Sequence, residues 1–476
     1  MPLPVITVAQ MREWESASWA AGRSEADVIR QVGRAVAERA RALTSPSDRI
    51  LILAGKGNNG ADARAAAEHL ADRRVEVLNI TVPDADLPAL DQALARKPAL
   101  VVDGLFGIGL NRPLDVPWTR LIQRVNGARC RVLAVDVPSG LNADTGETYG
   151  AAIEAALTLT VGAPKHGLLL SGAWPFVGRL EVTGDVGLVP CPLRAELNWT
   201  LPEDFDGFPP ARAAAAHKGS FGHLAILAGS LGYHGAAVLA ARGAQRAQPG
   251  LITVLPHEAA YHPIAAQLQA VMVRPWEATV KLPGDFSALL IGPGLAAPDI
   301  PEEMKATTRR LWRDVLIPIV VDASALDWLP LDPTPRGAVR VITPHPGEAA
   351  RLLKTTPARI QANRLAALRE LSLRFGNTWV VLKGHQTLVG RNEGEVFVNP
   401  TGNPHMAQGG SGDVLAGFIA GLLAQPELQK DPLRTLRYAV WRHGHAADVL
   451  SGWAAGASRP ARAGWVVEDL LTQLGD

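Results

Sequence analysis

Residues 399–425 read NPTGNPHMAQGGSGDVLAGFIAGLLAQ and are the most informative stretch of the chain. The glycine cluster at 409–412 leads directly into an apolar helical pattern with small residues on one face. A glycine-rich turn at a helix N-terminus presents backbone N–H groups at the positive end of the helix dipole, so we expect the amides of Gly410 to Gly412 to bind an anion. Asp413 would lie beside that anion and accept a proton from a substrate hydroxyl. The alternative is an aspartate that only caps the helix.

Short β-branched runs, each followed by glycines and a helical pattern, recur in both halves of the chain. This alternation predicts parallel sheets covered by helices, and hence an α/β protein with two doubly wound domains. The predicted strands are residues 49–54, 99–103, 131–135, 224–228, 288–291, 317–322 and 379–383.

A stretch rich in proline and acidic residues, 189–219, lies between the two sets of strands and has no sustained apolar period. Such composition is typical of a segment between domains. We place the boundary near Leu201, which gives domains of residues 1–200 and 201–476.

Composition narrows the class of ligand. The chain has 47 basic and 46 acidic residues among 476, a formal net charge of +1, so no long-range field attracts nucleic acid or an anionic membrane, and we expect a small-molecule substrate. Cys130 and Cys191 are too few for a disulfide framework or a thiolate metal site. The first residues, MPLPVITVAQMREWE, lack a secretory apolar stretch, and no run approaches the length of about 20 apolar residues that a membrane span needs. We expect a cytoplasmic protein that does not bind membranes.

Further segments of the C-terminal half suit a nucleotide site. LKGHQTLV at 382–389 is a second glycine turn with a cation, Lys383, and a hydroxyl, and TPHPGEAARLL places His345 and Glu348 at a strand-to-helix turn. VDASAL at 321–326 and IGPGL at 291–295 each follow a predicted strand. Singly, each segment also fits a structural loop, in which His345 caps a helix or fills a core and Glu348 is a helix N-terminal acid.

In this order, and with HKGSFGHLAILAGSLGYHGAA at 217–237, these motifs resemble the ribokinase-like family and, more closely, the ADP-dependent NAD(P)H-hydrate dehydratases. The resemblance runs from about His217 to the end and implies a ribokinase-like α/β domain. It implies dehydration of the S-epimer of hydrated NADH or NADPH with ADP or ATP and Mg²⁺: the nucleotide phosphorylates the ring hydroxyl, and loss of phosphate restores the double bond.

By the same resemblance Asp413 is catalytic. The residues implied to contact the hydrate are Ala236, Gly294, His345 and Asp413, and those implied to bind the nucleotide are Lys383, Gly384, His385, Gln386, Thr387, Gly410, Ser411 and Gly412.

Three segments of the N-terminal half end in polar turns. LILAGKGNNGADARAAAEHL, 51–70, is a strand, a glycine-asparagine loop and a helix, an arrangement that admits a phosphate at the helix start. VVDGLFGIGLNRPL at 101–114 and LAVDVPSGLNADTG at 133–146 each end a predicted strand with an aspartate. Buried carboxylates there need a cation or hydrogen-bond donors. The alternative for Asp103 and Asp136 is turn capping.

Over about Val5 to Leu188 these segments, together with GAPKHGLL, resemble the NAD(P)H-hydrate epimerase domain. The resemblance implies a Rossmann-like three-layer α/β/α domain that interconverts the R- and S-hydrates, with Asp136 at the reacting centre. The residues implied to hold K⁺ are Asn59, Asp103 and Ser139, and those implied to bind the hydrate are Asn58, Asn59, Gly60, Ala61, Asp62, Gly107, Ile108, Gly109, Leu110, Asn111, Arg112, Pro113 and Asp136.

Two positions depart from that pattern. Ala61 stands where a glycine is usual, and we expect its methyl group to crowd the ligand or to oppose a turn with positive φ. Arg30 stands where the family carries glutamate. The rival interpretation of the whole chain is an ATP-dependent kinase of a small alcohol, such as a sugar or vitamin precursor, with a non-catalytic N-terminal binding module. We expect a homo-oligomer.

Overall fold

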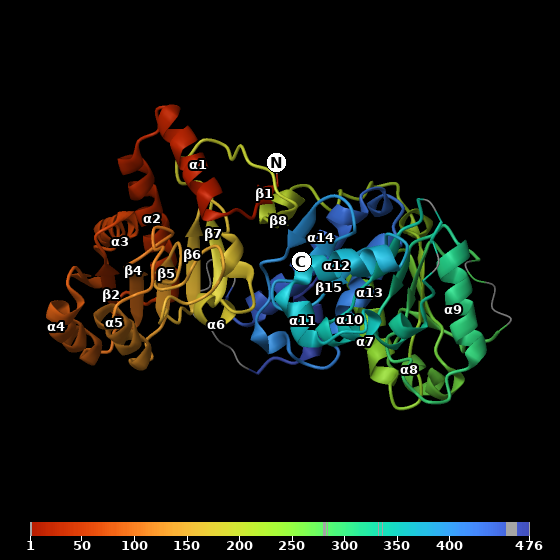
Figure 1. Ribbon diagram of the computed structural model, residues 1–476. Helices are drawn as coiled ribbons and strands as arrows, with labels where there is room; N and C mark the ends of the chain where they lie inside the picture. The colour runs from red at the N-terminus through yellow and green to blue at the C-terminus, as the bar shows by residue number, and fades with distance from the viewer. Residues whose placement is uncertain are drawn as a thin grey trace. The chain divides into compact units, whose positions relative to one another are not determined.

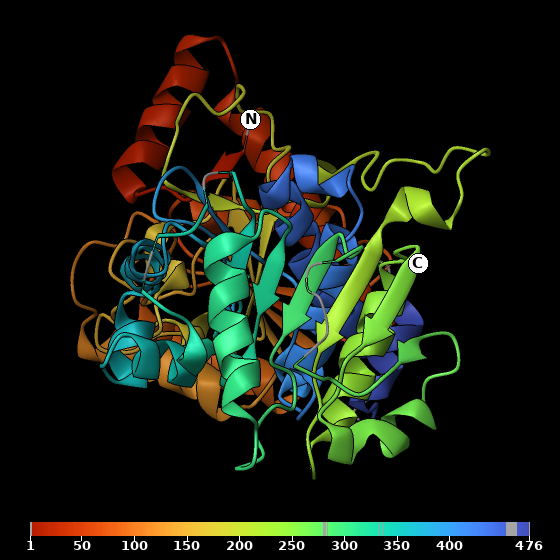
Figure 2. The ribbon, with the colours of Figure 1, turned by 90° about the vertical axis from the view of Figure 1, so that its right-hand side faces the viewer.

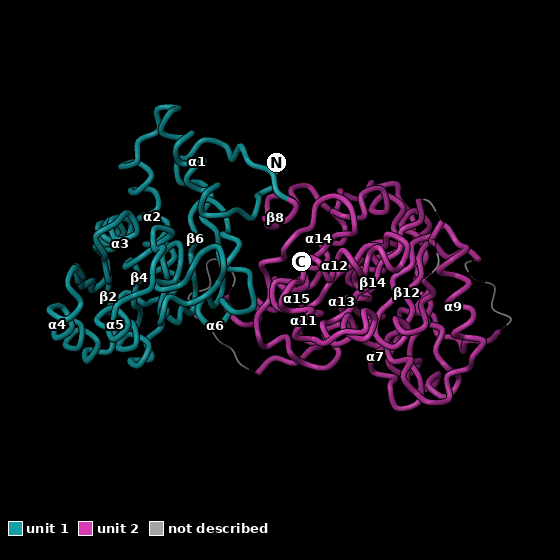
Figure 3. Tube along the Cα trace, viewed as in Figure 1, with its two compact units in different colours: residues 1–195, 455–460 teal, residues 196–454, 461–476 magenta. Residues whose placement is uncertain are grey.

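The chain folds into two α/β units, each with its own sheet and core, as the computed structural model shows for residues 2–278, 282, 284–331, 333–335, 337–453 and 464–475 (Figure 1, Figure 2). Unit 1 comprises residues 2–195 and unit 2 comprises 196–453 with 464–475 (Figure 3). The α/β class expected from the sequence is confirmed for both halves. In the described residues no helix is both long and apolar enough to cross a membrane.

The sheet of unit 1 is parallel throughout, in the order β3-β2-β4-β5-β6-β7. The order reverses between β2 and β4, and ligands of such sheets bind beyond the carboxyl ends of the strands at this switch point. Helices α2 and α3 pack together, as do α4 and α5. The elements are β1 (Leu3–Pro4), α1 (Val8–Ala20), α2 (Glu25–Leu43), β2 (Arg49–Ala54), α3 (Asn58–Glu68), β3 (Arg74–Asn79), α4 (Pro83–Ala95), β4 (Leu100–Gly104), α5 (Val116–Gly127), β5 (Val132–Val135), β6 (Leu157–Val161), α6 (Trp174–Val177) and β7 (Arg179–Thr183).

The sheet of unit 2 has the order β8-β17-β16-β15-β14-β13-β12-β9-β10-β11. Its pairs are parallel except β15–β16 and β16–β17, and its order reverses between β9 and β12. The strands are β8 (Leu197–Trp199), β9 (His223–Leu227), β10 (Leu251–Val254), β11 (Met272–Val273), β12 (Ala288–Ile291), β13 (Ile319–Val321), β14 (Arg340–Ile342), β15 (Trp379–Leu382), β16 (Leu388–Gly390) and β17 (Val396–Val398). The helices are α7 (His234–Arg246), α8 (Tyr261–Ala265), α9 (Glu302–Asp314), α10 (Pro346–Leu352), α11 (Pro357–Ala362), α12 (Arg364–Arg374), α13 (Ser411–Leu423), α14 (Pro432–Leu450) and α15 (Leu470–Gln473).

The strands predicted from the sequence all exist, and their ends agree with the structure to within two residues. The central strands are buried on both faces, as β2 illustrates, because helices cover a parallel sheet on each side and near-continuous apolar runs result. The other strands were missed, including buried ones such as β6 and β14, whose apolar runs are interrupted by threonine or only three residues long. Edge strand β3, RVEVLN, carries charged residues, which protect an exposed edge from pairing with other chains.

Helices α7 and α13 pack so closely in unit 2 that their backbones meet. A Cβ atom on Gly417 would lie 1.9 Å from the carbonyl oxygen of Ala240, and one on Gly243 would lie 2.3 Å from that of Val414. Both helices belong to the main core of this unit. The glycines of AGFIAG therefore fix the distance between α13 and its neighbour.

We predict that Gly417→Ala lowers the free energy of unfolding of unit 2 by about 1–3 kcal/mol, because the added methyl group forces the two helices apart. Gly235→Ala on α7 is the matched control, since nothing lies within 4 Å of the new methyl group. Chemical denaturation measures both variants. Equal stability of the two would show that the glycine contact does not limit the packing.

Candidate active sites in the two units

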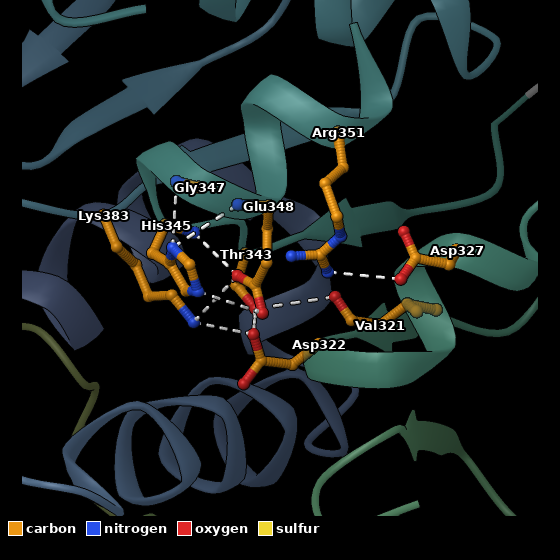
Figure 4. A network of polar contacts seen from close by, with 9 residues as sticks. All are labelled: Val321, Asp322, Asp327, Thr343, His345, Gly347, Glu348, Arg351 and Lys383. Atoms are coloured by element: carbon orange, nitrogen blue, oxygen red, sulfur yellow. Dashed lines mark hydrogen bonds and ion pairs between the residues drawn. The ribbon is translucent and has the colours of Figure 1, made fainter. Parts of the chain in front are cut away.

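In unit 2, polar side chains meet where three neighbouring strands end (Figure 4). Asp322 follows β13, Thr343 follows β14 and Lys383 follows β15. Asp322 is only 2% exposed, and its Oδ1 atom accepts hydrogen bonds from Lys383 Nζ at 2.7 Å and from Thr343 Oγ1 at 2.7 Å. The ammonium group offsets the cost of burying this carboxylate. The sequence prediction for the nucleotide site included Lys383 but missed Asp322.

Helix α10 brings two more side chains to this cluster. His345 is its N-cap: Nδ1 accepts from the amide of Gly347 at 3.0 Å, and the amide of His345 donates to Glu348 Oε2 at 2.8 Å. The same Glu348 oxygen lies 3.9 Å from Lys383 Nζ. The capping alternative for His345 and the helix N-terminal alternative for Glu348 are thus what the structure shows. The His345 side chain is nevertheless 54% exposed, which leaves its outer edge open to a ligand.

The first turn of α13 faces the same cluster. Gly410 is the N-cap in the left-handed conformation, with φ +94°, which favours glycine. A Cβ atom on Gly412 would lie 3.3 Å from Lys383 Nζ and 4.0 Å from Asp322 Oδ2. The helix begins at Ser411, whose amide donates to the carbonyl oxygen of Gln408 at 3.4 Å. The amides of Gly410, Gly412 and Asp413 have no partner within the described residues, so two of the three predicted amides are free. Asp413 is the third helical residue and does not cap the helix.

The charges of this cluster act on one another. Burial raises the pKa of Asp413 to about 7, with Asp322 and Glu348 acting in the same direction and Lys383 opposing them. Burial lowers the pKa of Lys383, but the surrounding carboxylates Asp322, Glu348 and Asp413 outweigh burial and raise it. Asp413 is therefore near its titration point at neutral pH beside a lysine that stays charged, which suits a group that accepts a proton.

The two remaining residues implied to contact the hydrate lie side by side. A Cβ atom on Gly294, which has φ +66°, would be 3.0 Å from Ala236 Cβ and 2.3 Å from the carbonyl oxygen of Tyr233. Ser230 Oγ donates to the carbonyl oxygen of Gly294 at 2.6 Å. These residues follow β9 and β12, the strands between which the sheet order reverses.

A buried arginine binds the backbone of the loop that follows β15. Arg364, at the start of α12, is 9% exposed and donates to the carbonyl oxygens of Leu382 at 3.1 Å, of Gln386 at 3.0 Å and of His385. Burial lowers its pKa to about 10. The loop needs such support because Gly384 and Gln386 both have positive φ. Within it, Thr387 donates to Gly384. No motif in the sequence pointed to Arg364.

Unit 1 contains a cavity of about 890 Å³ at its switch point. The loops after β2 and β4 line it, together with Asp136 after β5, and α1 and α2 form the opposite wall. The residues implied to bind the hydrate that do line it are Asn58, Asn59, Asp62, Gly107, Ile108, Gly109, Leu110, Asn111, Arg112, Pro113 and Asp136.

Two residues of that set, Gly60 and Ala61, do not line the cavity. A Cβ atom on Gly60 would lie 2.0 Å from the carbonyl oxygen of Gly55, so Gly60 permits close packing of the loop. Ala61 is in the first turn of α3, where the backbone is helical, and its methyl group does not line the cavity. The turn with positive φ that Ala61 would oppose is therefore absent. Arg30 pairs with Asp27 and is also outside the lining.

The residues implied to hold potassium form one buried group. Asp103 accepts from Ser139 Oγ at 2.6 Å and from the Ser139 amide at 2.8 Å, and burial raises the pKa of Asp103 to about 6. Asn59 Nδ2 donates to the carbonyl oxygen of Phe106 at 2.9 Å, whereas Asn59 Oδ1 is buried with no partner. The amide of Leu105 also donates to Asp103, as the turn-capping alternative expects. In the described part of the chain, no group of three or more His, Cys, Asp or Glu side chains is placed to hold a metal ion.

Asp136 is fixed by a lysine that the sequence analysis did not select. Lys165, fully buried, donates from Nζ to Asp136 Oδ1 at 2.6 Å, to the carbonyl oxygen of Val161 at 2.7 Å and to Thr160 Oγ1 at 3.1 Å. Asp136 has φ +63°, an unfavourable conformation that a non-glycine residue keeps only where its surroundings enforce it. GAPKHGLL contained the signal, since a lysine in an apolar stretch needs a buried acid.

Two known families match the chain. Residues 224–462 match the family described as NAD(P)H-hydrate dehydratase, and residues 25–91 and 78–167 match the family described as YjeF-related protein N-terminus. The bifunctional NAD(P)H-hydrate repair enzyme Nnr of Gloeobacter violaceus is 36% identical over 94% of this chain and 93% of that protein. The enzyme of the same description from Escherichia coli K12 is 31% identical over 94% of this chain and 88% of its own length.

Among solved structures, the ADP/ATP-dependent NAD(P)H-hydrate dehydratase from Bacillus subtilis, co-crystallised with ATP and Mg²⁺, is 30% identical. It covers 56% of this chain and 91% of that chain with a TM-score of 0.49. The resemblances stated for the two halves are confirmed by the matched families and by relatives that span nearly the whole sequence. The chain belongs to the family of bifunctional NAD(P)H-hydrate repair enzymes.

Proposed function

We propose that this chain repairs hydrated NADH and NADPH: unit 2 dehydrates the S-hydrate with ADP or ATP, and unit 1 interconverts the R- and S-hydrates. Membership of the family supports both activities. The observation that carries the dehydratase proposal is the position of Asp413 in the first turn of α13, within the charge cluster of Asp322, Lys383 and Glu348. That the chain acts in the cytoplasm as a homo-oligomer remains a prediction.

In unit 2 each part has a distinct task. The free amides at the start of α13 would hold the transferred phosphoryl group, and their preorganised dipoles would stabilise its charge. Asp413 would accept the proton of the ring hydroxyl as that oxygen is phosphorylated, so that phosphate can leave in place of hydroxide. The loop Lys383 to Thr387 would bind the nucleotide, and Ala236, Gly294 and His345 would contact the hydrate.

Magnesium would be bound mainly by the nucleotide phosphates. Carboxylate oxygens suit this hard cation, and Asp322 Oδ2 and the carboxylate of Glu348 lie beside the first turn of α13. When bound, Mg²⁺ neutralises charge on the phosphoryl oxygens.

In unit 1 the residues present fit a potassium ion. The unpartnered, buried Asn59 Oδ1 is an oxygen that lacks a donor, and the Asp103 carboxylate and the Ser139 hydroxyl belong to the same hydrogen-bonded group. Oxygen donors of this kind suit a hard cation. Potassium would supply positive charge near the carboxyl end of β4, and Asp136 would act at the reacting carbon.

The dehydratase proposal is tested by incubating the protein with the S-hydrate of NADH and either ADP or ATP. We expect the absorbance of the reduced nicotinamide to return and one phosphate to be released for each ring restored. Accumulation of a stable phosphorylated alcohol without recovery of absorbance would contradict dehydration and favour a kinase.

Asp413→Asn should lower the dehydration rate by about 10²–10⁴-fold, because the amide cannot accept the proton, while nucleotide affinity is retained. In the unsubstituted protein the rate should rise with pH through about 7, since burial raises the pKa of Asp413 to about 7 and only the ionised form is a base. Asp327→Asn is the control: Asp327 is half-exposed and pairs with Arg351. A pH profile unchanged in Asp413→Asn would exclude Asp413 as the base.

Potassium should stabilise unit 1 through Asn59. Replacing K⁺ by a large organic cation should lower the unfolding temperature of unit 1 and slow epimerisation, because an ion bound only to the folded state adds stability, about 2.7 kcal/mol at 100 times its Kd. Asn59→Ala should abolish the difference between the two salts. Thermal unfolding measures the stability, and a variant that keeps the full potassium response would refute this assignment.

A further inference from the structure

The cavity of unit 1 is lined by carboxyl groups, Asp115 among them, to which the epimerase proposal gives no chemical task. Glu15 of α1, Glu25 of α2 and Asp62 of α3 line it together with Asp136. The basic side chains of the lining are Arg12, Lys56, Arg112 and Lys165. Lys165 forms an ion pair with Asp136.

Asp136 offers one oxygen to a ligand. Its Oδ1 atom already accepts three hydrogen bonds, from Lys165 Nζ at 2.6 Å, the Val161 amide at 3.1 Å and Thr160 Oγ1 at 3.2 Å. Lys165 in turn uses all three of its N–H donors within the protein. These bonds fix the orientation of the Asp136 carboxylate and leave its Oδ2 atom available to a substrate. Lys165 has no further N–H group that could donate to a substrate.

Asp62, in contrast to Asp136, has no hydrogen-bond partner among the described residues. It is 9% exposed, lines the cavity from α3, and takes part in no hydrogen bond or ion pair within the described residues. Burial raises its pKa to about 8, reinforced by Asp136, Glu15 and Glu25. A carboxyl group in such surroundings holds its proton at neutral pH and can donate it.

We propose that Asp62 is a second catalytic residue of unit 1, which exchanges a proton with the ring nitrogen of the hydrate while Asp136 exchanges one with the hydroxyl. The inference rests on the epimerase activity proposed above. It assigns different tasks to two carboxyl groups of one cavity, and their different surroundings support that division.

The chemistry of the hydrate requires such a pair. Its hydroxyl lies on a carbon bonded to the ring nitrogen, so opening the ring at this carbon removes the stereocentre. Asp136 takes the hydroxyl proton, a C=O bond forms, and the C–N bond breaks with its electron pair passing to nitrogen, which takes the proton of Asp62. After rotation about the adjacent C–C bond, the same proton transfers in reverse close the ring as the other epimer. All protons return to their donors, and no co-reactant is consumed.

The test measures equilibration of the R- and S-hydrates by the full chain without nucleotide, so that unit 2 is silent. Asp62→Asn should slow it by about 10²–10⁴-fold while hydrate binding persists. The persisting hydrate binding checks that unit 1 is folded, and unchanged dehydration of the S-hydrate with ATP checks that unit 2 is unaffected. Asp91→Asn is the matched control, since Asp91 is a half-exposed residue of α4 that pairs with Arg124 outside the cavity lining. In the unsubstituted protein the rate should fall as pH rises through about 8, where Asp62 loses its proton.

Several outcomes would overturn the inference. Asp62→Asn that equilibrates the epimers at the unsubstituted rate would remove Asp62 from catalysis while the epimerase proposal stands. If Glu15→Gln lost activity while Asp62→Asn kept full activity, Glu15 rather than Asp62 would be the residue that donates the proton to the ring nitrogen. An unsubstituted chain no faster than spontaneous equilibration would refute the epimerase proposal itself, and the inference with it.

Discussion

The contact between the backbones of α7 and α13 is the constraint on which the unit 2 site depends. Gly417 and Gly243 let the helices approach until a methyl group would overlap a carbonyl oxygen. That spacing sets where the first turn of α13 lies, and this turn carries both the free amides and Asp413. The charged cluster faces it from the ends of three strands. Because one side of the site is fixed by main chain and the other by a parallel sheet, its charges need little reorganisation during a reaction.

Both units bury an aspartate and offset the cost of its burial with a lysine. Each has a buried aspartate just beyond a strand end, Asp322 in one and Asp136 in the other, and each pairs it with a lysine at 2.6–2.7 Å. The ion pair offsets the desolvation of both charges. A second, unpaired carboxyl group nearby then has a raised pKa, about 7 at Asp413 and about 8 at Asp62. In each unit the carboxyl group without a cation of its own is thus the one whose pKa lies close to neutral pH.

The features that could be predicted from the sequence were those determined by residues close together in the chain. The strands and the glycine turns were predictable because burial and backbone conformation are encoded within a few residues, and Gly410 to Asp413 illustrate this. The pairs Asp322–Lys383 and Asp136–Lys165 were missed because they depend on the order of strands in each sheet, which no short motif contains. The positive φ considered for Ala61 is absent because its backbone belongs to the first turn of α3, which begins at Asn58, rather than to the turn before the helix.

The buried guanidinium of Arg364 has a consequence for the surface above it. It draws the carbonyl oxygens of His385 and Gln386 inward. In a trans peptide the N–H group points away from the C=O group, so the amides that follow these carbonyls turn outward. An interior cation thereby gives the loop an outer face of hydrogen-bond donors with few acceptors. Such a face would favour acceptor-rich groups, such as the phosphate oxygens of the nucleotide that we propose to bind here, over groups that need acceptors.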